Sequence, residues 1–555
     1  MNQTKQVDVT IGGRTVRVPY MTPVGAVVEE HAPRGPHPAL AAIVHHRCVD
    51  LDFPLRAPTE VVPVDYTTRE GVLVYRRSAA LLLLEAARQL HPGVRVTIGQ
   101  ALGNGYFHRI HLDWPFGQND LRALDQRMRK LVDQDLPLRT ETVSLHEARE
   151  IFTELGFSST LRLLETWWEP HVPLVWCGGF CDIHQQPVAP STGYLSVFQL
   201  VHYPPGLILR FPPRGQPRMV QPYRDTPQLF QVYSETRSWN RLLGVESVGE
   251  LNQVTVSGEA SNLIRIAEGL HEKKIAHIAD RVSAHDELAL VLIAGPSASG
   301  KTTFAKRLSL QMMVNGVRPV ALSTDNFYVN REDTPRDADG NYDFESIEAI
   351  DLELFNETLG RLLAGEEVLT PRFDFTRGRR RDREAWIPMR LEAGQVLMVE
   401  GIHGLNQRLT PAVPEARKFK IYVSALTQLC IDDHNRIFTS DTRLLRRIVR
   451  DRLFRGYSAA TTIETWPSVR RGEMRNIFPH QEHADVMFNS ALVYEKAVLR
   501  LFAERFLLEV PQDHPSFVNA YRLLRFVQNF VPMFDEKVPQ ISLLREFVGG
   551  SAFRY

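Results

Sequence analysis

Eight consecutive residues, Gly295-Pro-Ser-Ala-Ser-Gly300-Lys301-Thr302, have the spacing G-x-x-x-x-G-K-[ST]. Glycines at both ends let the backbone turn so that successive N–H groups face one point, and a following helix adds its positive end. The ammonium group of Lys301 adds a full charge, and the Thr302 hydroxyl is a ligand that Mg²⁺ accepts. The motif predicts a site for nucleotide phosphates; the alternative is an ordinary glycine turn before a helix.

Two carboxylates follow other apolar runs of the chain. Asp325 is the third residue after the run 317–322, and Glu400 comes directly after residues 396–399. The carboxyl ends of parallel strands form the ligand-binding edge of an open α/β sheet. At that edge Asp325 could accept a proton from an attacking hydroxyl, and Glu400 could hold Mg²⁺. A helix N-cap for Asp325 and a strand-end salt bridge for Glu400 are the competing interpretations.

A third group is cationic and consists of Arg443, Arg446, Arg447, Arg450 and Arg455. On a helix several of these side chains share one face, where their repulsion requires neutralising acids or an anion. Donors of this kind surround the triphosphate in phosphoryl-transfer enzymes. A solvated charged face is the alternative. A second basic run, residues 377–383, suits an acceptor, nucleotide or RNA phosphate, or is simply an exposed loop.

Short, continuously apolar segments indicate strands that are buried on both faces, and helical segments alternate with them. This pattern predicts a mostly parallel α/β sheet, with strands within residues 288–294, 317–322, 396–399 and 421–423.

The first half has a different pattern. Alternating apolar residues within 7–18, separated by Gly12-Gly13, predict a β-hairpin in a small β-rich module. Residues 72–233 suggest an α+β domain. The expected helices and strand there, with a connecting helix beyond, are helices at 78–90, 119–131 and 145–155, a strand at 194–202, and the connecting helix at 258–284.

Composition indicates a protein of several globular domains. Of 555 residues, 43% are hydrophobic and 23% charged, and 65 basic residues balance 65 acidic ones. This balance gives no overall field that favours nucleic acid or membrane. The longest apolar runs are too short to span a bilayer, and residues 1–9 lack the features of a secretory signal, so a cytoplasmic location is expected. The four cysteines are expected to be reduced thiols.

Over about residues 286–510 the chain resembles the uridine kinase and phosphoribulokinase family. The family's ordered motifs are the P-loop, D-x-F-Y, a substrate loop, E-G-I and an arginine-rich lid. They appear here as residues 295–302, Asp325-Asn-Phe-Tyr328, 371–380, Glu400-Gly-Ile402 and 443–456.

This resemblance implies ATP and Mg²⁺ as cofactors and a role for each matching residue. The implied catalytic residues are Asp325 as general base, Lys301, Arg447 and Arg450; the nucleotide-binding residues are Gly295, Ser297, Ser299, Gly300, Lys301, Thr302, Thr303, Arg446 and Arg455; the Mg²⁺ ligands are Thr302 and Glu400; and the acceptor-binding residues are Tyr328, Asp343, Phe373 and Arg380.

The acceptor side departs from the uridine kinase pattern. Phe373 stands where those enzymes have a tyrosine, and Gly378 stands where they have a histidine that reads the pyrimidine. The ribose-gripping aspartate aligns with Asp343, in a changed context. The phosphoryl-transfer machinery is therefore kept while uridine specificity is open.

The first half resembles the N-terminal region of threonyl-tRNA synthetase, on residues that include Ile98-Gly99, Gly103-Asn-Gly-Tyr106 and Asp135-Leu-Pro137. The editing centre of that family needs an H-x-x-x-H pair and a later cysteine and histidine, but Arg77, Leu81, His184 and Val188 stand at these positions. A degenerate editing domain is expected. The division that follows is a TGS-like β-grasp module at 1–66, the degenerate α+β second additional domain at 67–235, a helical connector at 236–285, an α/β P-loop kinase at 286–510 and a helical extension at 511–555.

The leading hypothesis is an enzyme that transfers a phosphoryl group from ATP to a small hydroxyl acceptor, a nucleoside by the resemblance. The main alternative is an ATP-gated regulator that binds RNA or an amino acid through its N-terminal half. A trans-editing hydrolase is disfavoured by the missing ligands. The acceptor, the ligand of the N-terminal half and the oligomeric state are left open by the sequence.

Overall fold

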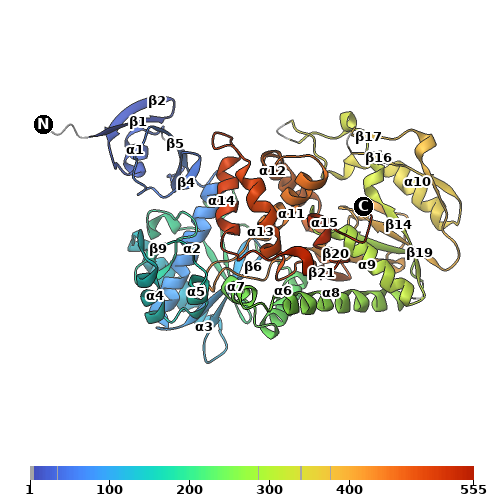
Figure 1. Ribbon diagram of the computed structural model, residues 1–555, viewed down its shortest axis with the longest axis horizontal. Coiled ribbons are helices and arrows are strands. Elements are labelled where there is room, and N and C mark those ends of the chain that lie inside the picture. Colours follow the sequence, from blue (N-terminus) through green and yellow to red (C-terminus); the bar gives the residue numbers. More distant parts are fainter. Residues whose placement is uncertain (1–4, 34, 286, 338–339, 376, 555) are drawn as a thin grey trace.

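The structure is a computed structural model that describes residues 5–33, 35–285, 287–337, 340–375 and 377–554. A small N-terminal sheet lies at one end of the molecule and a parallel sheet at the other, with helices α11 to α14 between them (Figure 1). Among the described residues, no helix is both long and apolar enough to cross a bilayer.

The N-terminal module is a five-stranded sheet in the order β2-β1-β5-β3-β4, with β1 and β5 parallel. The predicted hairpin is confirmed: β1 and β2 pair across Gly12 and Gly13, both with positive φ as a tight hairpin turn requires. The elements are β1 (Gln6–Ile11), β2 (Arg14–Pro19), α1 (Val24–His31), β3 (Ala41–Val44), β4 (Arg47–Val49) and β5 (Thr59–Val64).

Two antiparallel sheets follow, in the orders β11-β12-β7-β6 and β10-β9-β8, and the long helix α2 packs into the same core as both. Thr68 caps α2, because its hydroxyl accepts from the N–H of Gly71 at 3.0 Å. The elements are α2 (Arg69–Leu90), β6 (Arg95–Leu102), β7 (Gly105–His111), α3 (Gln118–Asp133), β8 (Leu138–Ser144), α4 (Leu145–Glu154), α5 (Ser158–Leu164), β9 (His171–Cys177), β10 (Phe180–Ile183), β11 (Gln199–Tyr203) and β12 (Gly206–Arg210).

The strand expected at 194–202 is wrong in its first half. Residues Thr192–Leu195 form a 3₁₀ turn, and the strand begins only at Gln199. The Thr192 hydroxyl donates to Leu131 O at 2.6 Å and accepts from Leu136 N at 2.8 Å. These side-chain bonds replace the bonds of a strand at this point.

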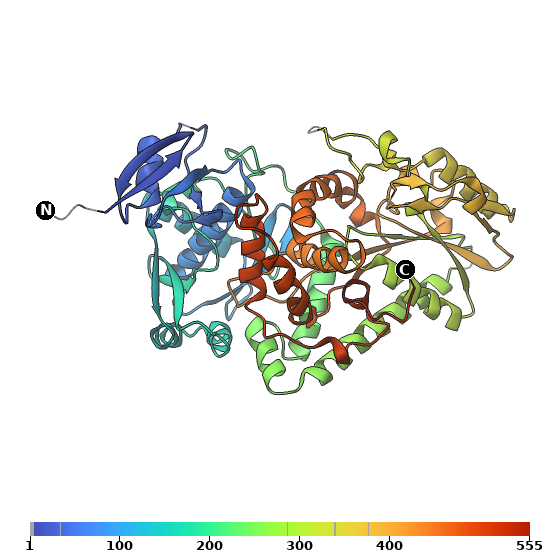
Figure 2. The same ribbon diagram turned by 45° about the horizontal axis from the view of Figure 1, so that its top comes forward.

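Three helices lead to the second half: α6 (Pro227–Leu242), α7 (Val248–Val256) and α8 (Ala260–Ser283). The last confirms the predicted connecting helix. In both ribbon views α8 runs lengthwise from the middle of the molecule to α9 (Figures 1 and 2).

The second half has an entirely parallel five-stranded sheet in the order β14-β19-β13-β20-β21, which confirms the predicted α/β fold. The sheet and its surroundings are β13 (Leu290–Ala294), α9 (Lys301–Val314), β14 (Arg318–Ser323), α10 (Leu352–Leu363), β15 (Val368–Thr370), β16 (Phe373–Asp374), β17 (Arg379–Arg380), β18 (Ile387–Met389), β19 (Gln395–Glu400), β20 (Lys418–Ser424), α11 (Thr439–Phe454), α12 (Ala459–Asn476), β21 (Val486–Asn489), α13 (Glu495–Leu508), α14 (Phe517–Val527) and α15 (Arg545–Val548).

One hydrophobic core joins the two halves. Its buried residues run from Val143 in β8 to Val548 in α15, and include members of α5, α7, α11 and α13. The cysteines described by the structure are all free thiols, as expected.

Candidate functional site

The P-loop connects β13 to α9 in a backbone form that depends on glycine. A Cβ atom on Gly295 would lie 2.0 Å from Val423 O, and Gly300 has a φ of +83°. Lys301 is the first residue of α9, so the N–H groups of Lys301, Thr302 and Thr303 have no partner within the helix. The loop therefore gathers donors at a helix N-terminus, as the motif predicts.

The two predicted carboxylates lie at the ends of neighbouring strands. Asp325 is in the 3₁₀ turn Thr324–Phe327 directly after β14, and Glu400 is the last residue of β19, next to β14 in the sheet. A Cβ atom on Gly401 would lie 1.7 Å from Thr324 Oγ1. Only glycine lets these two strand ends approach so closely.

Burial raises the pKa of Asp325, while the positive charges of Lys301, Arg455 and Arg450 lower it. Burial also raises the pKa of Glu400, to about 7, against the opposing effect of Lys301. Asp325 thus lies in the positive electrostatic field of Lys301, Arg450 and Arg455. The two arginines stand at the C-terminal end of α11, more than a hundred residues later in the sequence.

The oxygen donors at this edge fit Mg²⁺. Thr302 Oγ1 lies 3.5 Å from Glu400 Oε1, and the charge of Asp325 contributes to the raised pKa of Glu400. A hydroxyl beside clustered carboxylates is a typical donor set for this hard cation, which prefers oxygen and is held by few protein ligands. The residues present therefore suit the implied metal.

The cationic face of α11 is largely buried, so the solvated-face alternative is wrong. Arg443 donates to Glu473 and Arg446 donates to Glu495, and all four side chains are at most 1% exposed. Arg446 also donates to Ala298 O at 3.4 Å. Arg446, predicted to bind nucleotide, therefore contacts the backbone of the P-loop while it forms a buried ion pair with Glu495.

Three further arginines share one carboxylate. Arg447, Arg450 and Arg455 all contact Asp451, at 3.3, 3.0 and 3.6 Å. Arg447 also donates to the Ser297 hydroxyl at 3.0 Å, which ties this group to the P-loop. Three positive charges on one carboxylate leave an excess that favours an anion.

The P-loop serines differ in their surroundings. Ser297 contacts α11 and α12, whereas Ser299 is 1% exposed and its hydroxyl has no hydrogen-bond partner among the described residues. A buried donor in this state is available to a ligand.

The acceptor-side residues lie beside the general-base turn. The ring of Tyr328 is 5.8 Å from that of Phe373, and Phe373 is 5.1 Å from Phe375, so three aromatic rings cluster there. Arg380 donates to Asp351 at 3.0 Å, and Asp343 lies 3.6 Å from Arg475.

Gly378 has a positive φ of 67°, and a Cβ atom there would lie 2.7 Å from Arg331 Nε. An arginine therefore occupies the space beside the position where the resembled family has its base-reading histidine.

Three glutamates near the phosphate site were missed from the sequence. Glu473 accepts from the P-loop N–H of Ser297 at 3.1 Å. Burial raises the pKa of Glu345 to about 7, and its neighbours include Glu473 and Lys301. Glu546, in the C-terminal extension, accepts from both Thr303 N at 3.2 Å and Thr303 Oγ1 at 2.7 Å. Glu473 and Glu546 neither follow a strand nor belong to a motif, and Glu345 lies two residues after Asp343 in a segment that departs from the family pattern, so no sequence signal assigns them a role.

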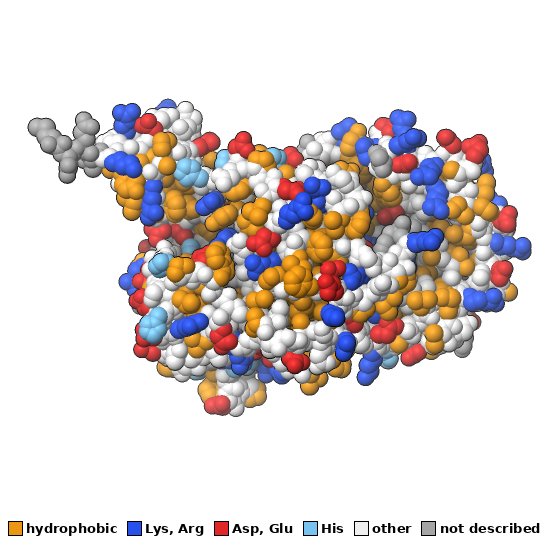
Figure 3. Space-filling model, viewed as in Figure 1, with side chains coloured by type: hydrophobic (Ala, Val, Ile, Leu, Met, Phe, Trp, Pro, Cys, Tyr) orange, Lys and Arg blue, Asp and Glu red, His pale blue; other side chains and the backbone are white. Residues whose placement is uncertain are grey.

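The basic run at 377–383 belongs to the hairpin of β16 and β17 and is partly paired with acids. Arg379 lies 3.0 Å from Glu332, and Arg381 lies 3.6 Å from Asp374. Figure 3 shows this face of the molecule hollowed between the middle part and the part that carries the hairpin, with blue side chains along that side.

The four residues at the positions of the editing centre do not form a set of catalytic groups. Arg77 is paired with Asp182 at 2.6 Å, and His184 Nε2 lies 3.0 Å from Asp50 Oδ2. Leu81 and Val188 are buried in the core.

Comparison with known proteins separates the two halves of the chain. Residues 290–495 match the sequence model of the phosphoribulokinase / uridine kinase family. The N-terminal part is similar to threonine–tRNA ligases. That of Rubrobacter xylanophilus is 32% identical over 174 residues, which are 31% of this chain and 27% of the ligase.

A second ligase, from Syntrophotalea carbinolica, is 35% identical over 164 residues, 29% of this chain and 26% of the ligase. The chain thus spans about a quarter of the length of these relatives. A solved structure described as a possible uridine kinase from Bacillus stearothermophilus has 17% identity and a TM-score of 0.28, and covers 39% of this chain and 98% of that one.

Proposed function

On the premise that residues 290–495 form a region of the phosphoribulokinase / uridine kinase family, we propose that the protein transfers the γ-phosphoryl group of ATP to a hydroxyl group of a small acceptor. The observation that carries the proposal is the field around Asp325. This carboxylate lies in the turn directly after β14, where burial raises its pKa and the positive charges of Lys301, Arg455 and Arg450 lower it.

Each group has a task in an in-line transfer. Asp325 orients the acceptor hydroxyl and takes its proton as the new P–O bond forms. Burial raises its pKa, which suits a base that must accept a proton. Lys301 and the arginines around Asp451 stabilise the charge that spreads over the transferred group.

Mg²⁺, which Thr302 and Glu400 would hold, supplies a further positive charge on the phosphate oxygens when it is bound. The donors of the P-loop, which lie at the N-terminus of α9, hold the remaining phosphates.

The acceptor is proposed to be a nucleoside. The rings of Tyr328, Phe373 and Phe375 form an aromatic surface beside the base, and such a surface stacks on a flat nucleobase. Arg331 lies beside Gly378 and offers hydrogen-bond donors where uridine kinases have a histidine. This difference supports a nucleobase other than uracil, or uracil bound through different hydrogen bonds.

The test uses the full chain with Mg²⁺ and γ-labelled ATP against panels of nucleosides, sugars and polyols. We expect labelled product with at least one nucleoside and none with the Asp325→Asn variant. A polyol product and no nucleoside product would contradict the acceptor class while leaving the transfer reaction in place. ATP hydrolysis without transfer, stimulated by tRNA, would instead support the ATP-gated regulator.

A further inference from the structure

The segment 429–441, which links β20 to the arginine helix α11, is held by the N-terminal half. The backbone N–H of Ile98 donates to Asp433 O at 2.8 Å, and the N–H of Asp433 donates to the Ser159 hydroxyl at 3.1 Å. Arg95 in β6 holds the Asp433 carboxylate with two hydrogen bonds, at 2.7 and 2.9 Å. Both main chain and side chain of this segment are thus fixed by residues some 270 to 340 positions earlier.

A buried polar network extends this contact. The side-chain amide of Asn435 lies 3.1 and 3.3 Å from the oxygens of Asp182 and 2.9 and 3.0 Å from those of Asp432. Arg77 completes the pairing of Asp182. Because the amide occupies the space between the two carboxylates, the group formed with His434 has the composition but not the free oxygens of a metal site.

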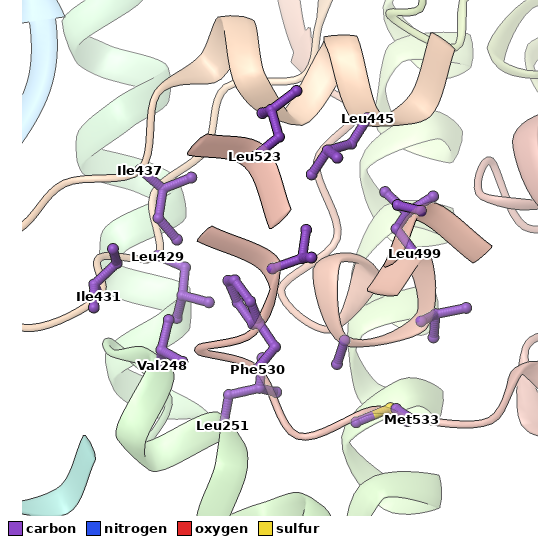
Figure 4. Close-up of a cluster of buried hydrophobic side chains, with 14 of the residues drawn as sticks. Val248, Leu251, Leu429, Ile431, Ile437, Leu445, Leu499, Leu523, Phe530 and Met533 are labelled. Atoms are coloured by element: carbon purple, nitrogen blue, oxygen red, sulfur yellow. The ribbon is translucent and has the colours of Figure 1, made fainter. Parts of the chain in front are cut away.

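Apolar contacts surround this network. Residues of the segment and of α11 pack against α7, α13, α14 and the tail, as Figure 4 shows with Leu429, Ile431, Ile437, Leu445, Val248, Leu251, Leu499, Leu523, Phe530 and Met533. Close-packed protein interiors transmit strain, so a displacement on one side of this core is expected to affect the other side.

The first turn of α11 is anchored by one arginine from each half of the chain. Asp441 accepts from Arg522 of α14 at 2.6 and 2.9 Å, and Arg69 at the start of α2 lies 4.0 Å from it.

The arginines of α11 touch the P-loop directly. Arg443 donates to Ser297 O and Arg447 to Ser297 Oγ, both at 3.0 Å. The helix thus has its start held by Arg522 of α14 and Arg69 of α2, and two of its arginines in contact with the P-loop.

From this arrangement we infer that the threonine–tRNA-ligase-like half is a positioning element of the kinase: through Arg95 and Asp182 it holds the segment 429–441, and thereby sets where the arginines of α11 stand at the P-loop. The inference rests on the proposed function, since it assigns those arginines to ATP. In this role the N-terminal half affects ATP binding and turnover without editing activity and without contacting ATP.

The pair Arg95 and Asp433 provides the test, because it crosses between the halves and Arg95 is 54% exposed, so its loss is tolerated by the fold. We would measure kcat, KM for ATP and the Kd of ATP for Arg95→Ala, Asp433→Ala and the double variant. Arg109→Ala is the matched control: Arg109 lies on the adjacent strand β7 and has no ion pair with any residue the structure describes.

We expect each single variant to weaken ATP binding and kcat/KM for ATP about three- to tenfold, a size typical of coupled neighbours. The double variant should lose no more than the worse single one, Arg95→Lys should recover part of the loss, and Arg109→Ala should match the wild type. Asn435→Ala should act in the same direction.

A merely structural contact would lower the melting temperature and leave kcat, KM and Kd of the folded protein unchanged, and that result would overturn the inference. Additive losses in the double variant would also overturn it. If the wild type transfers no phosphoryl group, the proposed function fails, and the Kd of ATP in the same set of variants still decides whether the N-terminal half positions α11.

Discussion

The Glu546 carboxylate accepts a hydrogen bond from a backbone N–H that is proposed to bind the phosphates of ATP. Thr303 lies in the first turn of α9, so its backbone N–H has no carbonyl partner within the helix. This N–H and the Thr303 hydroxyl both donate to the Glu546 carboxylate. Backbone N–H groups at this place in a P-loop cradle the α- and β-phosphates. Leu543, just before α15, also packs on the loop, since a Cβ atom on Gly300 would lie 3.1 Å from its side chain. Phosphates that bind here must therefore displace the Glu546 carboxylate or bind against its electrostatic repulsion.

The size of the effect follows from these two bonds. A hydrogen bond to a charged group contributes about 1.5–3 kcal/mol, and about 1.4 kcal/mol corresponds to a tenfold change in affinity. Glu546→Gln keeps the shape of the side chain and removes its charge. It should therefore tighten ATP binding about ten- to a hundredfold.

Titration calorimetry with Mg²⁺ and ATP measures this change, and ADP, which has the same α- and β-phosphates, should gain by the same factor. Glu536→Gln removes the same charge from an exposed residue of the same tail and should leave the Kd unchanged. Equal or weaker binding by Glu546→Gln would refute the assignment of Thr303 to the phosphates, or of Glu546 as their competitor.

Three other predictions concern the site and its support. Gly401→Ala should lower the free energy of unfolding by about 1–3 kcal/mol in denaturant titrations, because its Cβ atom meets Thr324 at 1.7 Å, whereas Gly360→Ala, in open space on a helix, should not; equal stability of both variants would contradict the close strand contact. Arg450→Ala should reduce kcat at least about a hundredfold with little change in melting temperature, as loss of a phosphate-facing arginine does; an unchanged kcat would remove Arg450 from the reaction. His271 is buried and the pKa of its ring is lowered to about 3, so the unfolded chain binds the extra proton first and stability falls with pH between about 6.5 and 3, by up to about 1.4 kcal/mol per unit; His271→Gln should show a shallower acid limb in urea titrations at successive pH values, and an identical limb would exclude this residue as its cause.

The sequence predicted those parts of the site that depend on local order. A strand followed by glycines, Lys301 and a helix places donors at one edge of a sheet, and a carboxylate directly after a buried strand must lie at that same edge. Asp325 and Glu400 were found in this way, and the structure brings them together. Their chemical roles remain predictions.

The partners that complete the site come from distant parts of the chain. The need of the α11 arginines for neutralising acids was foreseen, but Glu473 and Glu495 lie 30 and 49 residues beyond their partners and in no motif. Asn435 and Glu546 gain their positions only when the two halves and the tail pack. Such contacts depend on the tertiary fold, which periodicity and spacing along the chain do not specify.

The most direct test of phosphoryl transfer is the rate at which label moves from γ-labelled ATP to a nucleoside, measured for the wild type and for Asp325→Asn. The account predicts transfer by the wild type and a loss of about a hundredfold or more in the variant, the size expected for removal of a general base, with ATP still bound. Equal rates in the two proteins, or no transfer to any acceptor by a wild type that binds ATP, would contradict it.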